Sequence, residues 1–296
     1  MQSLHFVNRT TKVSNVQARK MHRVKTSLRS NLQTRIISAI ALGVPFLILS
    51  YLGGWWFTAV ILIAVLICAY EFHRLMQSAG YRPNLLVNVT ALLAVFVGLR
   101  LPNLPILAPA FSLVLLGSLA WQLRHTQQGS VADWALSFAG GLYLGWTGEH
   151  LAGVRELNQG LWWLILTLTT TWLADSGAFL VGRRLGRHKL APNISPGKTW
   201  EGYLGGIVFG TLGGALIGAI SPIGIPVAVA GGLLVSAFST LGDLAESMFK
   251  RQANAKDSGT LIPGHGGVFD RIDSLLWSGV LIYYLAFYLG PVVAHP

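Results

Sequence analysis

Long stretches without a charged residue alternate along this chain with short connections that carry the charges. The uncharged windows cover residues 36–70, 83–99, 101–123, 134–148, 157–174, 202–242 and 274–296. A helix that crosses a membrane needs about 20 mostly apolar residues, and the two longest windows have room for two such helices each. The pattern therefore predicts an all-α polytopic membrane protein.

Glycine and proline divide the two longest windows. The first breaks at Gly53-Gly54 and the second at residues 221–226, a Ser-Pro-Ile-Gly-Ile-Pro run, because these residue types favour a turn. We therefore expect nine transmembrane helices, near residues 36–52, 55–71, 84–100, 104–123, 134–151, 161–181, 203–220, 225–242 and 274–293.

The composition excludes several other classes of protein. Hydrophobic residues make up 52% of the 296 residues and charged residues only 11%, whereas about 25% of the residues in a soluble domain are charged. A soluble globular enzyme, a disordered protein and a DNA-binding domain are excluded, so we expect a lipid bilayer as partner and no nucleic acid. The single cysteine, Cys68, lies in an apolar stretch, so we expect no disulfide framework and no cysteine-rich metal site.

The positions of Lys and Arg predict the orientation in the membrane. With the N-terminus placed in the cytoplasm, all but two of the 22 basic residues fall in cytoplasmic segments, and the exceptions are Arg100 and Arg155. Basic residues accumulate on the cytoplasmic side of membrane proteins. The split therefore favours nine helices, a cytoplasmic N-terminus and a C-terminus on the opposite side.

We divide the chain into three parts. Residues 1–34 form a basic tail, residues 35–160 an N-terminal transmembrane region, and residues 161–296 a C-terminal transmembrane region that carries the candidate chemistry. The tail has no acidic residue. This composition is typical of a disordered cytoplasmic tail that touches anionic lipid, and a targeting segment is the alternative.

Acidic side chains gather in the C-terminal region. Seven of the eleven lie between Asp175 and Asp273, all at predicted cytoplasmic loops or helix ends. A carboxylate inside a span costs roughly 2.5 to 3.5 kcal/mol, so it is a candidate for function. Oxygen ligands without cysteine favour Mg²⁺, and the candidate ligands are Asp175, Asp243, Glu246, Asp270 and Asp273. The alternatives are a solvated salt-bridge face at residues 243–250 and a helix N-cap role for Asp270 or Asp273.

Basic and glycine-rich stretches accompany these acids. Residues 182–189 are densely basic and lead to 195–202, while residues 256–267 are rich in glycine and proline. Cations suit a substrate with several phosphates, and glycines let the backbone approach such a ligand closely. For residues 182–189, an anchor on the cytoplasmic side is the alternative.

The segment from Ser247 to Asp273 resembles the C-terminal signature of the CDP-diacylglycerol synthases, also called phosphatidate cytidylyltransferases. The matching residues are Ser247, Lys250, Arg251, Lys256, Asp257, Gly259, Ile262, Pro263, His265, Gly266, Gly267, Asp270, Arg271, Ile272 and Asp273. Residues 174–179 and 195–202 are also similar to the family, as are residues 71–74 in the first half. Gly197 departs from the pattern, since members of the family usually carry lysine there.

The resemblance implies an enzyme that transfers CMP from CTP to phosphatidic acid, releases pyrophosphate and leaves CDP-diacylglycerol in the bilayer. The catalytic residues expected on this basis are Lys250, Arg251, Lys256, Asp257, His265 and Arg271. The expected substrate-binding residues are Ser176, Lys198, Thr199, Glu201, Gly266 and Gly267. Mg²⁺ is the expected cofactor, and Asp175 or Asp273 either completes its shell or holds a second, monovalent or divalent, cation. The attacking phosphate oxygen is already ionised, so no strong base is required, and His265 either binds a phosphate or fixes its loop.

Some alternatives stay open at this stage. Glycines at 206, 210, 214 and 218 give the seventh span a face of small residues, which suits helix packing within one chain or across a homodimer. Competing functions are a CTP-dependent lipid-alcohol kinase, an archaeol-type cytidylyltransferase and a transporter with broken helices. The expected location is the bacterial inner membrane, with an organellar membrane as the alternative.

Overall fold

The computed structural model describes residues 37–101, 103–124 and 130–289, and these are almost entirely helical. The helices are Ile37–Leu52, α2 (Gly54–Ser78), α3 (Leu85–Arg100), α4 (Leu107–Gln122), α5 (Ser130–Val154), α6 (Gly160–Leu185), α7 (Trp200–Ile220), α8 (Ile225–Gln252) and α9 (Phe269–Leu289). Each span expected from the sequence overlaps one of them. The tail at 1–34 and the end of the ninth span lie outside the described residues.

Five of these helices, α2, α6, α7, α8 and α9, are long and apolar enough to cross a membrane. Three shorter helices, Ile37–Leu52, α3 and α4, are also apolar. The helical membrane fold is therefore confirmed at this level. The count of nine spans stays a prediction.

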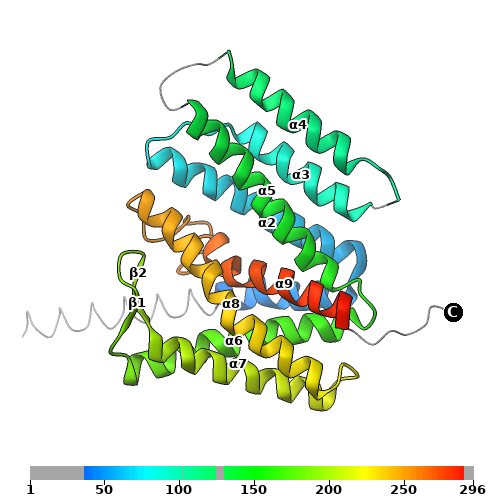
Figure 1. Ribbon diagram of the computed structural model, residues 1–296, viewed down its shortest axis with the longest axis vertical. Coiled ribbons are helices and arrows are strands. Elements are labelled where there is room, and N and C mark those ends of the chain that lie inside the picture. Colours follow the sequence, from blue (N-terminus) through cyan, green and yellow to red (C-terminus); the bar gives the residue numbers. More distant parts are fainter. Residues whose placement is uncertain (1–36, 102, 125–129, 290–296) are drawn as a thin grey trace, which may run out of the picture.

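The helices form two groups that share one core. Figure 1 shows α2 to α5 in the upper part of the molecule and α6 to α9 in the lower part. The groups meet where α5 and α2 pack against α9 and α8. Fully buried side chains from both groups, including Phe57, Leu144, Leu151, Leu276 and Ile282, belong to one hydrophobic cluster.

The glycine face of α7 packs inside this chain. A Cβ added at Gly206 would lie 2.9 Å from the carbonyl oxygen of Ala174 on α6, and one at Gly214 would lie 3.1 Å from the Cα of Gly232 on α8. Backbones can approach this closely only where a side chain is missing. The sequence suggested helix packing either within one chain or across a homodimer. The structure shows the glycine face packed within the chain, against α6 and α8.

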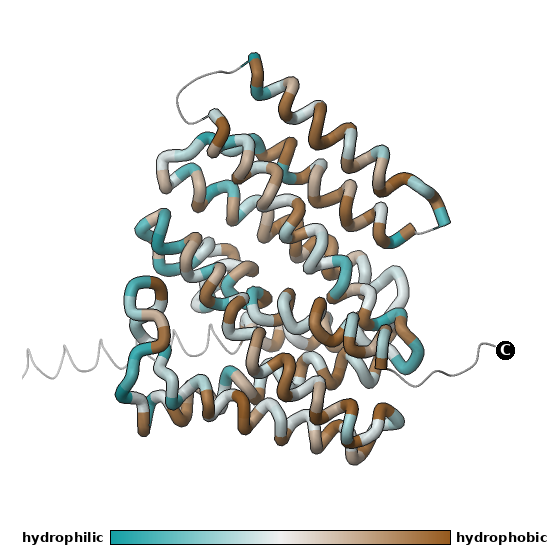
Figure 2. The backbone as a smooth tube through the Cα atoms, in the orientation of Figure 1, coloured by the Kyte–Doolittle hydropathy of each residue, from teal (hydrophilic) through white to brown (hydrophobic). Residues whose placement is uncertain are grey.

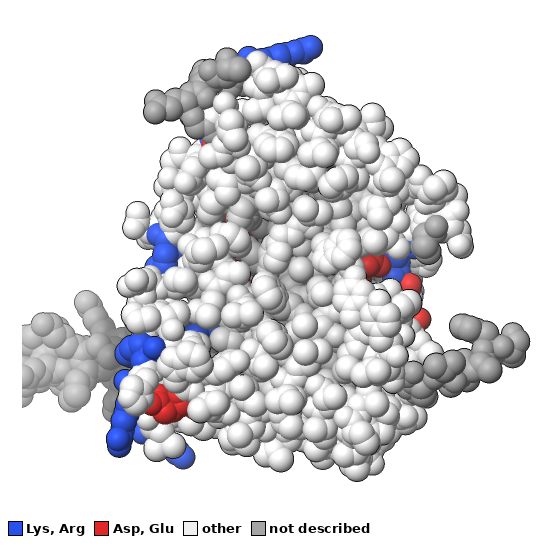
Figure 3. Space-filling view, viewed as in Figure 1, with Lys and Arg blue, Asp and Glu red and all other residues white. Residues whose placement is uncertain are grey.

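Charges occupy the two ends of the helices. In Figure 3 the blue and red atoms lie mainly at the left and right edges, and the band between them is mostly white. Figure 2 shows the same division along the backbone, with hydrophobic helices and hydrophilic ends. The two exceptional arginines share one end, because Arg155 donates to the carbonyl oxygen of Ser50 at 2.9 Å and Arg100 to Thr58 at 2.6 Å.

Several helices continue beyond the predicted spans, and this brings charged residues onto helical turns. Helix α2 runs to Ser78, α8 runs without a break to Gln252, and α9 begins at Phe269. Between α6 and α7 the chain forms an antiparallel hairpin of β1 (Lys189–Ala191) and β2 (Ser195–Thr199), which the sequence analysis did not anticipate.

Candidate active site

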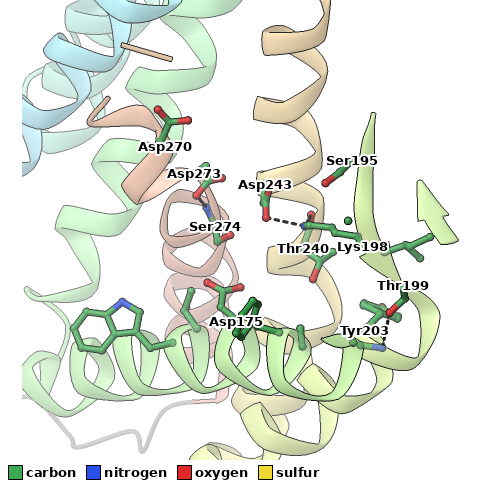
Figure 4. Close-up of a pocket in the computed structure, with 18 of the residues that line it drawn as sticks. Asp175, Ser195, Lys198, Thr199, Tyr203, Thr240, Asp243, Asp270, Asp273 and Ser274 are labelled. Atoms are coloured by element: carbon green, nitrogen blue, oxygen red, sulfur yellow. Dashed lines mark hydrogen bonds and ion pairs between the residues drawn. The ribbon is translucent and has the colours of Figure 1, made fainter. Parts of the chain in front are cut away.

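A cavity of about 840 Å³ opens among α6, the hairpin, α8 and α9. This volume lies within the range of about 300 to 1,000 Å³ that is usual for ligand sites. Figure 4 shows that Asp175, Asp243 and Lys198 come from separate elements and point into one space. The expected site residues that line the cavity are Asp175, Lys198, Thr199, Asp243, Lys250, Asp257, Asp270, Arg271 and Asp273.

Three carboxylates form the centre of the site. Asp243 and Glu246 lie three residues apart on α8 and therefore share a face, and Asp273 faces them from the first turns of α9. One ligand atom from each of these side chains lies within 4.8 Å of the others. Asp175 points into the same cavity from α6, as Figure 4 shows.

This cluster fits a hard divalent cation. Glu246 is 1% exposed, and one of its oxygens is ion-paired with Lys250. Its other oxygen is buried and has no hydrogen-bond donor among the described residues. A buried carboxylate oxygen without a donor is costly, and a metal ion coordinated there would satisfy it. Carboxylate oxygens are also the protein ligands that Mg²⁺ prefers.

Two lysines balance the negative charge of the cluster. Lys198, on β2, reaches the carboxylate of Asp243 at 2.8 Å. Lys250 lies between Glu246 and Asp270, with a distance of 2.8 Å to the Asp270 oxygen. Both ammonium groups line the cavity, so a phosphate that entered would meet cations as well as carboxylates.

Asp270 has a different environment from the other predicted metal ligands. One of its oxygens accepts from Lys250. The other accepts from the backbone N–H and the hydroxyl of Ser258, at 2.8 and 2.9 Å, and from the N–H of Gly267 at 2.9 Å. This carboxylate therefore holds the α8–α9 loop, residues 253–268, and lies outside the group of three that could bind a metal together.

The hairpin is fixed at its base by residues that the sequence analysis placed in substrate binding. Thr199 caps α7 by accepting from the N–H of Gly202 at 3.2 Å. Glu201 accepts from the backbone N–H of Arg187 at 3.0 Å and contacts Nδ1 of His188 at 2.5 Å. In this arrangement Thr199 and Glu201 orient the hairpin, and Lys198 is the residue that reaches into the cavity.

Other predicted site residues lie beside the cavity wall. Arg251 donates to the carbonyl oxygen of Ile194 at 3.1 Å and so ties the hairpin tip to α8. The backbone carbonyl oxygen of His265 accepts from Arg271 at 3.0 Å, and the role of the imidazole stays a prediction. The remaining expected residues that are not part of the cavity wall are Ser176, Glu246, Lys256, Gly266 and Gly267.

Some cavity residues were missed by the sequence analysis. The hydroxyl-bearing residues of the wall include Thr171, Tyr203, Thr240 and Ser274. Nothing in their spacing distinguishes them from hydroxyl groups that bond to their own helix, as Thr171 does at 2.7 Å.

Comparison with known proteins identifies the chain. A family model described as the cytidylyltransferase family matches residues 33–289. The chain belongs to this family. Similar curated proteins, each named phosphatidate cytidylyltransferase, occur in Brucella suis, Synechocystis and Pseudomonas aeruginosa. They are 38%, 35% and 41% identical to this chain, over 90%, 88% and 82% of its length and 96%, 98% and 93% of theirs.

Proposed function

We propose that this protein transfers CMP from CTP to phosphatidic acid and so makes CDP-diacylglycerol and pyrophosphate for phospholipid synthesis. The observation that carries the proposal is a cluster of three carboxylates that is paired with two lysines at a charged end of the helices. Asp243, Asp273 and both lysines line the cavity there, and the buried Glu246 adjoins them. The match to the cytidylyltransferase family over residues 33–289 supports the same reaction.

In this reaction an ionised oxygen of the lipid phosphate attacks the α-phosphorus of CTP. The bond between that phosphorus and the oxygen bridging to the β-phosphate breaks, and pyrophosphate leaves with the bond electrons. The chain therefore needs to provide position and charge neutralisation, with no covalent nucleophile. Lys198 and Arg271 are placed to neutralise phosphates in the cavity, because both line it, Lys198 from β2 and Arg271 from α9.

Mg²⁺ would be held by Asp243, Glu246 and Asp273. Asp175 lines the same cavity and would either complete the coordination of that ion or bind a second cation. A bound Mg²⁺ supplies charge stabilisation to phosphate oxygens. Lys250 orients Glu246 and Asp270 from between them. Asp257, which also lines the cavity, is placed to orient a cation there.

We propose the finer topology on the same grounds. Nine spans, a cytoplasmic N-terminus and an opposite C-terminus would place the cavity at the cytoplasmic face of a bacterial inner membrane, where CTP is available. The separation of charges between the two ends supports this placement. A homodimer would need a surface other than the glycine face of α7, because α6 and α8 cover that face.

The test is a transfer assay in detergent with labelled CTP and phosphatidic acid, with and without Mg²⁺. We expect a lipid-soluble cytidine product and pyrophosphate, and a fall of at least about 100-fold for Asp273→Asn, typical of losing a major transition-state contact. The matched control is Asp133→Asn, since Asp133 accepts from the N–H of Arg82 near the start of α5.

The products also distinguish two of the rival functions. A lipid-alcohol kinase would release CDP, and a transporter would give no lipid-soluble nucleotide. Either result, or normal turnover in Asp273→Asn, would refute the proposed role of this site.

A further inference from the structure

Glu71 is a buried acid that belongs to the other half of the molecule. It lies on α2, is 5% exposed, and is the first charged residue after the uncharged window 36–70. Its carboxylate accepts hydrogen bonds from the N–H groups of Val268 and Phe269, at 3.0 and 2.8 Å. The hydroxyl of Ser258 lies 3.0 Å from the same carboxylate. All three partners belong to the α8–α9 loop or to the start of α9.

Two glycines let the loop approach this carboxylate. A Cβ added at Gly259 would lie 2.6 Å from Oε1 of Glu71, and one at Gly267 would lie 2.5 Å from Oε2. Any side chain at either position would push the loop away from Glu71. Gly259 and Gly267 are therefore explained by a contact with α2, and substrate contact is not needed to account for these two glycines.

The contact also stabilises the beginning of a helix. The first N–H groups of a helix have no partner within it, and a carboxylate placed there is favoured by the helix dipole. Glu71 satisfies the N–H of Phe269, where α9 begins, while Asp270 satisfies the N–H of Gly267. The first turn of α9 is thus held by one acid of its own and one acid from α2.

A continuous set of polar contacts connects Glu71 with the site. The Ser258 hydroxyl lies between Glu71 and Asp270, at 3.0 and 2.9 Å, and has one proton to share between them. Asp270 in turn accepts from Lys250 at 2.8 Å, and Lys250 pairs with Glu246 of the carboxylate cluster.

We propose that Glu71 is a positioning residue for the transfer reaction. It fixes the α8–α9 loop and the first turn of α9 so that Asp270 and Asp273 face the cavity. The side chain lines no part of the cavity wall, so it acts through the loop and does not touch substrate. The inference rests on the proposed function for its kinetic consequences, while its structural part can be measured without turnover.

The test compares Glu71→Gln with Glu149→Gln. Both replace a buried glutamate by its neutral isostere, and Glu149 is 6% exposed. Glu149 precedes His150, which contacts Tyr284, and Tyr284 lies about 22 Å along α9 from Phe269 at 1.5 Å per residue. The control therefore removes a buried carboxylate far from the loop.

Two readouts are expected to change in Glu71→Gln alone. Amide hydrogen exchange of the peptide covering 256–270 should become at least about tenfold faster. The amide of Gln keeps one acceptor oxygen, so one of the two N–H groups loses its partner and the other bond is no longer charge-assisted. The kcat/KM for CTP should fall about 10- to 100-fold, as is typical when a residue that orients metal ligands is replaced. The protein should remain monodisperse in detergent.

A double-mutant cycle with Ser258→Ala tests the connection. If Glu71 acts through the loop, the loss in kcat/KM for the double variant should be smaller than the product of the two single losses. If Glu71→Gln does not fold, Gly259→Ala gives the same test from the loop side, because its added Cβ meets Glu71 and no charge is changed.

Unchanged exchange and unchanged kinetics in either folded variant would overturn the inference. So would an equal change in Glu149→Gln, since that result would indicate a general loss of stability. Absence of turnover in the unmodified protein would refute the proposed reaction, and the exchange measurement would still report on the contact.

Discussion

Lys250 has the most constrained environment of the basic residues around the cavity. It lies between a carboxylate of its own helix, Glu246, and one of the next helix, Asp270. Its side chain is 11% exposed and that of Asp270 is 6% exposed. A buried charge that loses its partner costs far more than the pair contributes when intact. Lys250 is therefore required for the stability of the site as well as for its charge balance.

This reasoning gives a prediction for Lys250→Met, a change that keeps the length of the side chain. It leaves two buried carboxylates facing each other, so we expect a loss of about 3 to 5 kcal/mol in the free energy of unfolding. Thermal unfolding in detergent measures the effect. The control is Lys256→Met at an exposed position, where the change should stay within about 0.5 kcal/mol. Equal melting temperatures for the two variants would contradict the prediction.

At the scale of single residues, the sequence predicted which side chains gather but not what each one does. Asp270 and Asp273 lie three residues apart at a helix start, and the sequence predicts metal binding for both, with a helix N-cap role for one of them as the alternative. In the structure Asp270 accepts from Ser258 and Gly267, while Asp273 faces Asp243 and Glu246. Asp270 differs from Asp273 because the α8–α9 loop supplies hydrogen-bond donors to it. The path of this loop follows no periodic sequence pattern, so it could not be predicted.

At the scale of elements, hydropathy located the helices well because each one is a long apolar run. It did not locate their charged ends, since a helix such as α8 continues to Gln252 through charged residues, beyond the apolar run. The hairpin was missed for a related reason. Its strands are three and five residues long, too short for an alternating pattern to be recognised.

The packing of α7 leads to a prediction at this scale. Gly214→Ala places a methyl group against the backbone of α8, 3.1 Å from the Cα of Gly232, so we expect a loss of about 1 to 3 kcal/mol. Gly117→Ala is the matched control on α4, where an added Cβ meets nothing within 4 Å. There the better helix propensity of alanine should leave stability equal or slightly higher. Thermal unfolding of both variants measures the two effects. A Gly214→Ala variant as stable as the unmodified protein would contradict the close backbone contact between α7 and α8.

For the whole molecule, the distribution of charge was the most informative feature of the sequence. Lys and Arg counts alone placed Arg100 and Arg155 on one side, and the structure brings both to the same end, near residues 50–58. What the counts could not predict is how the two groups of helices pack together. That arrangement depends on contacts between residues nearly 200 positions apart, such as Glu71 with Phe269.

The orientation can be measured with a single introduced cysteine. The native Cys68 is fully buried, so a Cys68→Ala background removes the only thiol. Lys256→Cys should then react with a membrane-impermeant maleimide only from the cytoplasmic side, and Asn158→Cys only from the opposite side. Labelling of both positions from the same side of sealed vesicles would refute the proposed topology.

The contact between Glu71 and the start of α9 has a consequence for how the chain can be divided. A fragment that begins at Gly160 would contain the whole family signature and every carboxylate of the cluster, yet it would lack the acid that secures the first turn of α9. We expect such a fragment to be inactive by itself. Co-expression with a second fragment that ends before Gly160 should restore turnover, because that polypeptide supplies Glu71 to the start of α9.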